Sequence, residues 1–422
     1  MNKTVALHTL GCKLNYSETA TLGKLLENDG FTKKNFDEVA DVYVINTCSV
    51  TENADKECRQ LVRRIQRKAP DAMVVITGCY AQLKPGEIAS IPGVDLVLGA
   101  AEKFNIINHL KELTKNDTAK ICSCDIEDVN VFMPSQSMNE RTRIFLKVQD
   151  GCDYNCSFCT IPLARGHSRS NTIENVIKDA EAIALSGGKE IVLTGINLGD
   201  FGKGYTGGKK HGENFKELIS ELDKIQGIER YRISSIEPNL LSNDIIEFVS
   251  NSKKFMPHFH IPLQSGSNKI LASMRRRYQK ELYQEKTGLI KLLMPHCCIG
   301  ADVIVGFPGE TSKDFDETVN FLTNTDISYL HVFTYSERNN THAIAIEPVV
   351  PIQTRHERSK TLRTLSYTKM NAFTERHIGE NRKVLFESEN KNGMMEGFTD
   401  NYIKITTPFR KEWENEVVDW RI

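Results

Sequence analysis

One nine-residue segment constrains this chain more than any other. In residues 151–159 three cysteines, Cys152, Cys156 and Cys159, are spaced C-x3-C-x2-C directly after an apolar, strand-like run. Thiolates are soft ligands that suit iron–sulfur clusters, and four of them would complete the ligation of a cubane. Because three leave one iron open to a small molecule, the spacing predicts a cluster that does chemistry.

Two other interpretations of the segment are weaker. A structural zinc site usually combines two C-x2-C pairs or mixes cysteine with histidine, and it closes its fourth position. Buried free cysteines would have no reason to adopt this spacing. Tyr154 and Phe158 stand between the thiols, and we expect their rings to keep water away from a cluster.

Bulk composition sets the remaining limits. A chain of 422 residues exceeds what one hydrophobic core usually supports, so we expect two or three domains. No apolar run reaches the length of a membrane span, and no signal-peptide core follows Met1. We therefore expect a cytoplasmic protein whose eleven cysteines are metal ligands or free thiols. With a net charge of −1, any RNA contact must come from local basic patches.

The first 114 residues alternate strands and helices, which predicts a doubly wound, Rossmann- or flavodoxin-like sheet. The expected strands are 4–7, 42–45, 73–76 and 95–98, and the expected helices are 17–29, 51–68 and 85–91. Cys12, Cys48 and Cys79 each follow one of the first three strands. Parallel strands end at the same edge, so we expect these thiols to converge on a second cluster, although each alone reads as an ordinary buried cysteine.

The rest of the chain divides into a polar linker (115–140), a central domain (141–374) and a short tail (375–422). Six strand–helix repeats in the central domain predict a complete or partial TIM-type (β/α) barrel, with its chemistry at the carboxyl ends of the strands. The expected strands are 144–148, 190–193, 231–234, 259–262, 301–305 and 329–333. Short strands separated by Asn, Gly and Pro predict a small β barrel in the tail.

These motifs together resemble the radical S-adenosylmethionine (SAM) methylthiotransferase family. The resemblance rests on the C-x3-C-x2-C loop and on Thr9-Leu10-Gly11-Cys12-Lys13-Leu14-Asn15, Asn46-Thr47-Cys48-Ser49-Val50-Thr51 and Thr77-Gly78-Cys79-Tyr80-Ala81-Gln82. It implies two [4Fe–4S] clusters, one on each cysteine triad, with SAM on the open iron of the loop cluster. The tail resembles the TRAM domain, an RNA-binding barrel. The motif Gly-Cys-Lys-Leu-Asn is most similar to the one in the family branch that acts on tRNA N6-threonylcarbamoyladenosine (t6A).

The resemblance also implies contacts for SAM and for substrate. The glycine-rich segment before the second barrel strand would face SAM's methionine, a carboxylate after the third would accept from ribose hydroxyls, and a later strand end would contact adenine. The predicted SAM-binding residues are Tyr154, Phe158, Gly187, Gly188, Glu190, Ser235, Glu237, Gln264, Val305 and Gly306. The predicted substrate-binding residues are Arg165, Arg169, Arg275, Lys383, Tyr402 and Lys404.

The function expected from this resemblance is conversion of t6A at tRNA position 37 to its 2-methylthio form. The loop cluster would cleave SAM reductively, and the amino-terminal cluster would supply the sulfur. Expected partners are the tRNA anticodon stem-loop, an electron donor and a sulfur source. Two alternatives stay open. One is the same chemistry on isopentenyladenosine tRNA or a ribosomal-protein aspartate, and the other is a non-catalytic, metal-structured RNA-binding protein.

Overall fold

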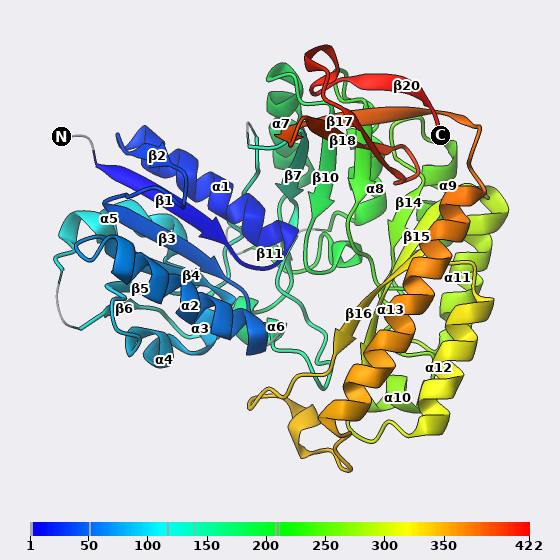
Figure 1. Cartoon of the computed structure of the whole chain (residues 1–422), viewed down its shortest axis with the longest axis horizontal. Coiled ribbons are helices and arrows are strands. Elements are labelled where there is room, and N and C mark those ends of the chain that lie inside the picture. The colour runs from blue at the N-terminus through cyan, green and yellow to red at the C-terminus, as the bar shows by residue number, and fades with distance from the viewer. Residues whose placement is uncertain (1–2, 50–51, 116–117, 139, 207–208, 211) are drawn as a thin grey trace.

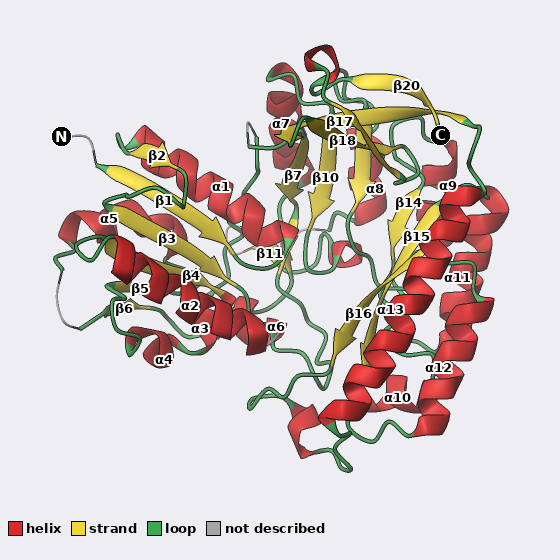
Figure 2. Cartoon of the chain, in the orientation of Figure 1, coloured by secondary structure: helices red, strands yellow, loops and turns green. Residues whose placement is uncertain are grey.

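The computed structural model describes residues 3–422 except 50–51, 116–117, 139, 207–208 and 211. The chain forms an amino-terminal α/β part, a central open barrel and a carboxyl-terminal antiparallel sheet that lies against the barrel (Figure 1). Figure 2 shows helices outside the strands of both α/β parts. No helix among the described residues is long and apolar enough to cross a membrane.

The amino-terminal part is a parallel sheet of order β2-β1-β3-β4-β5-β6. Its strands are β1 (Thr4–Thr9), β2 (Thr32–Lys34), β3 (Val42–Thr47), β4 (Met73–Gly78), β5 (Leu96–Leu98) and β6 (Lys120–Cys122). Its helices are α1 (Lys13–Asn28), α2 (Glu52–Lys68), α3 (Cys79–Leu83), α4 (Pro85–Ala89) and α5 (Ile106–Glu112). All six residues of β3 are buried, because helices cover both faces of the sheet.

This order confirms the predicted doubly wound sheet and is of the flavodoxin type. The short edge strands β2 and β6 were not predicted. Helix α1 begins at Lys13, four residues before the predicted start, and follows the extended backbone of Cys12. Residue 51, where the second helix was expected to begin, lies outside the described residues.

The barrel is built from parallel strands in two groups, β13-β10-β7 and β14-β15-β16. A parallel bridge between Tyr231 and Phe255 lies where the two groups meet. The strands are β7 (Arg143–Lys147), β10 (Glu190–Thr194), β13 (Arg230–Ile233), β14 (His258–His260), β15 (Cys298–Val305) and β16 (Tyr329–Thr334). The main helices are α7 (Ile173–Leu185), α8 (Phe215–Leu222), α9 (Asn243–Asn251), α11 (Lys280–Leu293), α12 (Ser312–Asn324) and α13 (Ile352–Glu375).

The barrel is partial, because no pairing between β7 and β16 is recorded in the described part of the chain. Helix α1 of the amino-terminal part packs against β7 beside this opening. Alternate strand residues point outward into a large apolar core that includes Leu146, Leu193 and Val303. Polar side chains such as Arg232 and Asp302 occupy the other positions, so the interior keeps space for a site.

The carboxyl-terminal sheet has the order β19-β18-β17-β20, and every pair in it is antiparallel. Its strands are β17 (Asn381–Lys391), β18 (Met394–Thr399), β19 (Lys404–Pro408) and β20 (Val417–Arg421). Arg230 and Arg232 of β13 donate to the carbonyl oxygens of Phe398 and Thr399, at 3.0 and 2.7 Å. The sheet therefore covers the end of the barrel opposite the cysteine loop.

Candidate active site

The C-x3-C-x2-C loop lies at the carboxyl end of β7, as predicted. Backbone N–H groups of Tyr154 and Ile161 donate to the sulfur atoms of Cys152 and Cys159, each at 3.4 Å. Such N–H···S bonds are the contacts that tune thiolates holding an iron–sulfur cluster. Burial raises the pKa of Cys159 to about 12, so the free thiol keeps its proton until a metal displaces it.

An arginine that the sequence analysis did not single out completes the loop site. Arg276 donates from Nη1 to the sulfur of Cys156 at 3.2 Å and pairs through Nη2 with the carboxylate of Glu237. Its neighbour Arg277 lies over the Tyr154 ring, 4.0 Å from the centroid, while Arg275, the predicted residue, is exposed. Three consecutive arginines carry no signal in sequence that would separate the central one from its neighbours.

A cavity of about 210 Å³ adjoins Cys159. Gln264, Ile304 and Phe158 line it, and Gln264 has a left-handed backbone with φ of 67°. Strain of this kind in a non-glycine residue concentrates at functional sites. Gln264 follows β14, and Glu237 and Ser235 follow β13, so all three lie past strand ends on this side of the barrel.

The structure contradicts the adenine-side assignment of Val305. Its side chain belongs to the apolar core outside the barrel, and Ile304 lines the cavity instead. Gly306 follows the strand, but its backbone N–H is bonded to the Glu310 carboxylate at 2.7 Å. A Cβ on Gly306 would lie 2.3 Å from Cγ of Arg355, so the glycine serves the packing of α13.

The glycine-rich assignment is also wrong. Gly187 and Gly188 precede β10, and Glu190 is its first residue, so all three lie at the amino end of a strand whose carboxyl end is near the loop. The buried Glu190 carboxylate accepts from Nε of Arg232 at 2.9 Å. These residues support the barrel end that the carboxyl-terminal sheet covers.

The second cysteine triad assembles as predicted at the ends of β1, β3 and β4. A Cβ on Gly11, where φ is 104°, would lie 2.9 Å from the Cys48 sulfur, so the glycine permits a close approach between two strand ends. Asn15 donates to the carbonyl oxygens of Leu10 and Thr47, at 2.9 and 3.0 Å, and ties the ends together. Cys79 lies near enough to Cys12 for the charge of one to raise the pKa of the other.

Both triads fit a bulky cluster better than a zinc ion. A zinc–sulfur bond of about 2.3 Å puts sulfur atoms of a tetrahedral site roughly 3.8 Å apart. Among the described residues, the one group of three ligand atoms within 4.8 Å of one another is His260, Asp302 and His331, and neither cysteine triad meets that limit. Three thiols in each triad, spread wider than zinc requires, are the donor set of a [4Fe–4S] cluster with an open iron.

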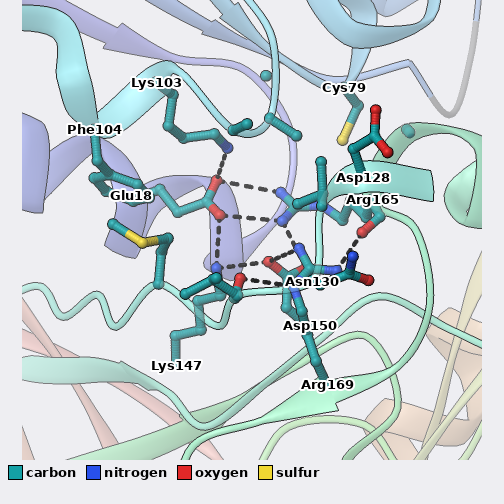
Figure 3. Close-up of a pocket in the computed structure, with 17 residues that line it drawn as sticks. Glu18, Cys79, Lys103, Phe104, Asp128, Asn130, Lys147, Asp150, Arg165 and Arg169 are labelled. Carbon is teal, nitrogen blue, oxygen red and sulfur yellow. Dashed lines mark hydrogen bonds and ion pairs between the residues drawn. The ribbon is translucent and has the colours of Figure 1, made fainter. Parts of the chain in front are cut away.

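A buried network of ion pairs joins the amino-terminal part to the barrel beside Cys79 (Figure 3). We call it the ion cluster: Glu18, Lys103, Lys147, Asp150, Arg165 and Arg169. Glu18 accepts from Lys103, Lys147 and Arg165 at 2.6, 3.0 and 3.1 Å. Asp150 accepts from Lys147, Arg165 and Arg169 at 2.6, 2.9 and 3.3 Å.

The ion cluster overturns the prediction that Arg165 and Arg169 bind substrate. Both guanidinium groups are buried and matched by carboxylates within the chain. Burial alone would raise the pKa of Glu18, but Arg165, Lys103 and Lys147 hold it well below its usual range. Arg165 therefore joins the two parts of the molecule through Glu18 and Asn15, and Arg169 holds Asp150 on the barrel side.

A second cavity, of about 270 Å³, lies between the Cys12 loop and the barrel interior. We call it the central cavity. Cys12 and Lys13 line it from the amino-terminal part, Arg143 and Arg232 from the barrel, and Tyr402 from the carboxyl-terminal sheet. Tyr402, predicted to bind substrate RNA, stacks on His258 at this cavity, with ring centroids 4.0 Å apart. Lys383 and Lys404 are exposed, and Lys404 pairs with Glu396 at 2.8 Å.

Comparison with known proteins places both cysteine triads in matched regions. The family model described as "Uncharacterized protein family UPF0004" matches residues 4–99, which contain Cys12, Cys48 and Cys79. The model described as "Radical SAM superfamily" matches residues 146–322, which contain the C-x3-C-x2-C loop.

Full-length relatives carry both regions in one chain. The threonylcarbamoyladenosine tRNA methylthiotransferase MtaB of Bacillus subtilis is 39% identical, over 99% of this chain and 93% of its own. The MtaB of Aquifex aeolicus is 40% identical, over 97% of each chain. The chain belongs to the radical SAM methylthiotransferase family. A tRNA-2-methylthio-N(6)-dimethylallyladenosine synthase of Clostridium botulinum is more distant within it, at 33% identity over 92% of this chain and 86% of its own.

Solved structures share the fold at low sequence identity. The radical SAM methyltransferase TsrM of Kitasatospora setae superposes with a TM-score of 0.56 at 15% identity, covering 82% of this chain and 77% of its own. At that identity the likeness speaks for a radical SAM fold alone.

Proposed function

We propose that this member of the family is a tRNA methylthiotransferase that converts t6A at position 37 to 2-methylthio-t6A. The observation that carries the proposal is the presence of two open cysteine triads in one chain, of which the amino-terminal triad reaches the central cavity through Cys12 and the loop triad reaches the cavity beside Cys159. The choice of t6A rests on the MtaB relatives, which are more similar to this chain than the dimethylallyladenosine synthase is.

Cys152, Cys156 and Cys159 would hold one [4Fe–4S] cluster, and Cys12, Cys48 and Cys79 the other. When bound, these clusters and SAM supply the radical, the sulfur and the methyl group for substitution at adenine C2. Arg276 donates to the Cys156 sulfur and is itself oriented by Glu237. Phe158, Ile304 and the aromatic wall of the cavity beside Cys159 keep water from that site.

Tyr154, Ser235, Glu237 and Gln264 are our proposed SAM contacts. We divide the chain into an amino-terminal domain (1–114), a linker (115–140), a radical SAM domain (141–374) and a TRAM-like RNA-binding domain (375–422).

Arg275, Lys383 and Lys404 remain proposed phosphate contacts, because each is exposed. Arg63, Arg64 and Arg67 form a further exposed basic face on α2. The reaction also requires an electron donor and a sulfur source, and we place it in the cytoplasm with its tRNA.

Nucleoside mass spectrometry of tRNA from a strain that lacks this gene tests the substrate. We expect 2-methylthio-t6A to disappear and t6A to accumulate, with both reversed by the wild-type gene. Persistence of 2-methylthio-t6A would exclude the proposed substrate. Loss of a 2-methylthio-isopentenyl nucleoside instead would favour the isopentenyladenosine alternative.

Two cysteine variants test the division of labour. Cys156→Ala removes a loop ligand and is expected to abolish SAM cleavage in the anaerobically reconstituted protein. Cys79→Ala is expected to retain SAM cleavage and lose sulfur insertion, and buried Cys58→Ala serves as the control for loss of a thiol. Wild-type protein should bind about eight irons, four per cubane. Zinc in place of iron, or methylthiolation by either ligand variant, would contradict the assignment.

A further inference from the structure

The central cavity has a charge character that the cluster chemistry does not require. Lys13, Arg141, Arg143 and Arg232 line it, and the described lining contains no Asp or Glu. An adenine ring and a methylthio group carry no negative charge, and a [4Fe–4S] cluster on three thiolates would bring only about one or two negative charges against four cations. Most of these cations must therefore serve another part of the substrate, or be neutralised within the protein.

The partners of each cation separate these two possibilities. Arg232 is satisfied within the protein, because its three donor nitrogens reach Glu190, Asp400 and Thr399 at 2.7–3.0 Å. Arg143 donates a hydrogen bond from Nε to Glu387 at 2.7 Å. Among the described residues, no hydrogen bond donated by its two terminal nitrogens is recorded.

Lys13 is the cation of this cavity with the fewest partners inside the protein. Across the described part of the chain no hydrogen bond or ion pair engages its ammonium group, although Tyr402, Arg143 and Asp302 are close enough to influence it electrostatically. Asp302 is already engaged by His260 and His331, at 2.9 and 3.3 Å. Arg141 contacts only rings in the described structure, with its guanidinium 5.1 Å from both the Tyr16 and Phe145 centroids.

The geometry points to an anion site in the central cavity, and we propose that Lys13, assisted by Arg141 and the free edge of Arg143, binds the carboxylate of the substrate's threonylcarbamoyl group. This inference rests on the proposed function and specifies which residues choose the substrate. Lysine and arginine bind carboxylates and phosphates through charge-assisted hydrogen bonds, and of these two anions the carboxylate is the one that the modified base itself carries. An isopentenyl group, which is uncharged, would offer these cations no counter-charge and would gain nothing from them.

Position supports the same assignment. Cys12, a predicted ligand of the sulfur-supplying cluster, immediately precedes Lys13 and lines the same cavity. A modified adenosine whose side group reaches Lys13 therefore has its base close to that cluster. Tyr402 and His258 supply a stacked aromatic wall beside the cation. Tyr402 has φ of 71°, in the left-handed region, and such conformations in non-glycine residues concentrate at functional sites.

Binding of matched tRNAs to the reconstituted full-length enzyme tests the proposal. The tRNAs are identical except that position 37 carries t6A, isopentenyladenosine or unmodified adenosine. We expect the wild-type enzyme to prefer t6A, and Lys13→Met to reduce that preference by about tenfold to a hundredfold, the worth of a hydrogen bond to a charged group. Affinity for unmodified tRNA should not change. Lys13→Arg should restore most of the preference, and Lys24→Met, on the exposed face of the same helix, should match the wild type.

Iron content is measured in every variant. If Lys13→Met loses iron, the comparison is made with Arg141→Gln, which is distant in sequence from every cluster cysteine and should lower the same preference. A wild-type enzyme without preference for t6A, or an unchanged preference in an iron-replete variant, would overturn the proposal. Equal loss of affinity for all three tRNAs would also overturn it, because that result marks a backbone contact. The proposed function fails separately, if the wild-type enzyme yields no 2-methylthio-t6A from the t6A tRNA.

Discussion

The ion cluster and the central cavity lie at the same junction between the amino-terminal part and the barrel, and both are rich in cations. In the ion cluster every cation is matched by Glu18 or Asp150 inside the protein. In the central cavity no described acid lines the wall, and Lys13 has no recorded partner. The cations therefore have two different roles at this junction. Where the chain supplies the counter-charge, the cations join the amino-terminal part to the barrel, and where it does not, we propose that a ligand supplies it.

Removal of a matched cation should have the largest effect on stability. Arg165→Met leaves Glu18 and Asp150 with fewer partners in a buried site, and we expect it to lower the free energy of unfolding by about 3–5 kcal/mol. Chemical denaturation of the metal-free protein, with exposed Arg363→Met as control, measures the difference. A change no larger than that of the control would mean that the ion cluster does not hold the two parts together.

The carboxylates of the ion cluster should give a smaller, pH-dependent effect. Their pKa values are lower in the folded chain than in the unfolded chain. Their contribution to stability is therefore complete above the ordinary glutamate value of 4.5 and is lost as pH falls below it.

Glu18→Gln measures that contribution. It should cost about 1–3 kcal/mol at neutral pH, and the gap from wild type should narrow under acid conditions. Denaturation at a series of pH values, with exposed Glu27→Gln alongside, records the gap. A gap that does not change with pH would show that the charge of Glu18 is not what stabilises the junction.

The smallest effect on stability is expected at the central cavity. Lys13 occupies the first turn of α1, where the helix dipole disfavours a cation, and it has no recorded partner to lose. Lys13→Met should leave the free energy of unfolding within about 0.5 kcal/mol of wild type, or raise it slightly. The same denaturation series provides the measurement. A loss approaching that of Arg165→Met would mean that Lys13 is a structural residue.

The two cysteine triads could be predicted because their signals are local. Spacing identified the loop, and the edge rule for parallel strands gathered Cys12, Cys48 and Cys79. Arg165 was misassigned because its partner Glu18 lies 147 residues earlier in the chain, and only the docking of two domains brings them together. The role proposed for Lys13 could not be predicted for the same reason, since three separate parts of the chain line its cavity.

Two errors on the SAM side could have been avoided from the sequence. Gly187 and Gly188 precede a strand, and in a parallel sheet such residues lie at the edge opposite the chemistry. For Val305, the alternation of inward and outward side chains along the strand would have been enough to exclude a contact with adenine. Gly300 and Asp302 are small or polar within an apolar run, and they mark the inward positions that Ile304 continues and Val305 does not.

The placement of Tyr402 changes how a shortened enzyme would have to be interpreted. Tyr402, which precedes β19 of the carboxyl-terminal sheet, stacks on His258 and so forms one wall of the central cavity. A chain that ends after α13 would lose this wall of the central cavity together with any RNA contacts that the sheet makes. Inactivity of such a fragment would therefore not show where tRNA binds. Substitutions on the outer face of the sheet would leave the cavity wall intact, so a loss of tRNA affinity in those variants would report on RNA binding alone.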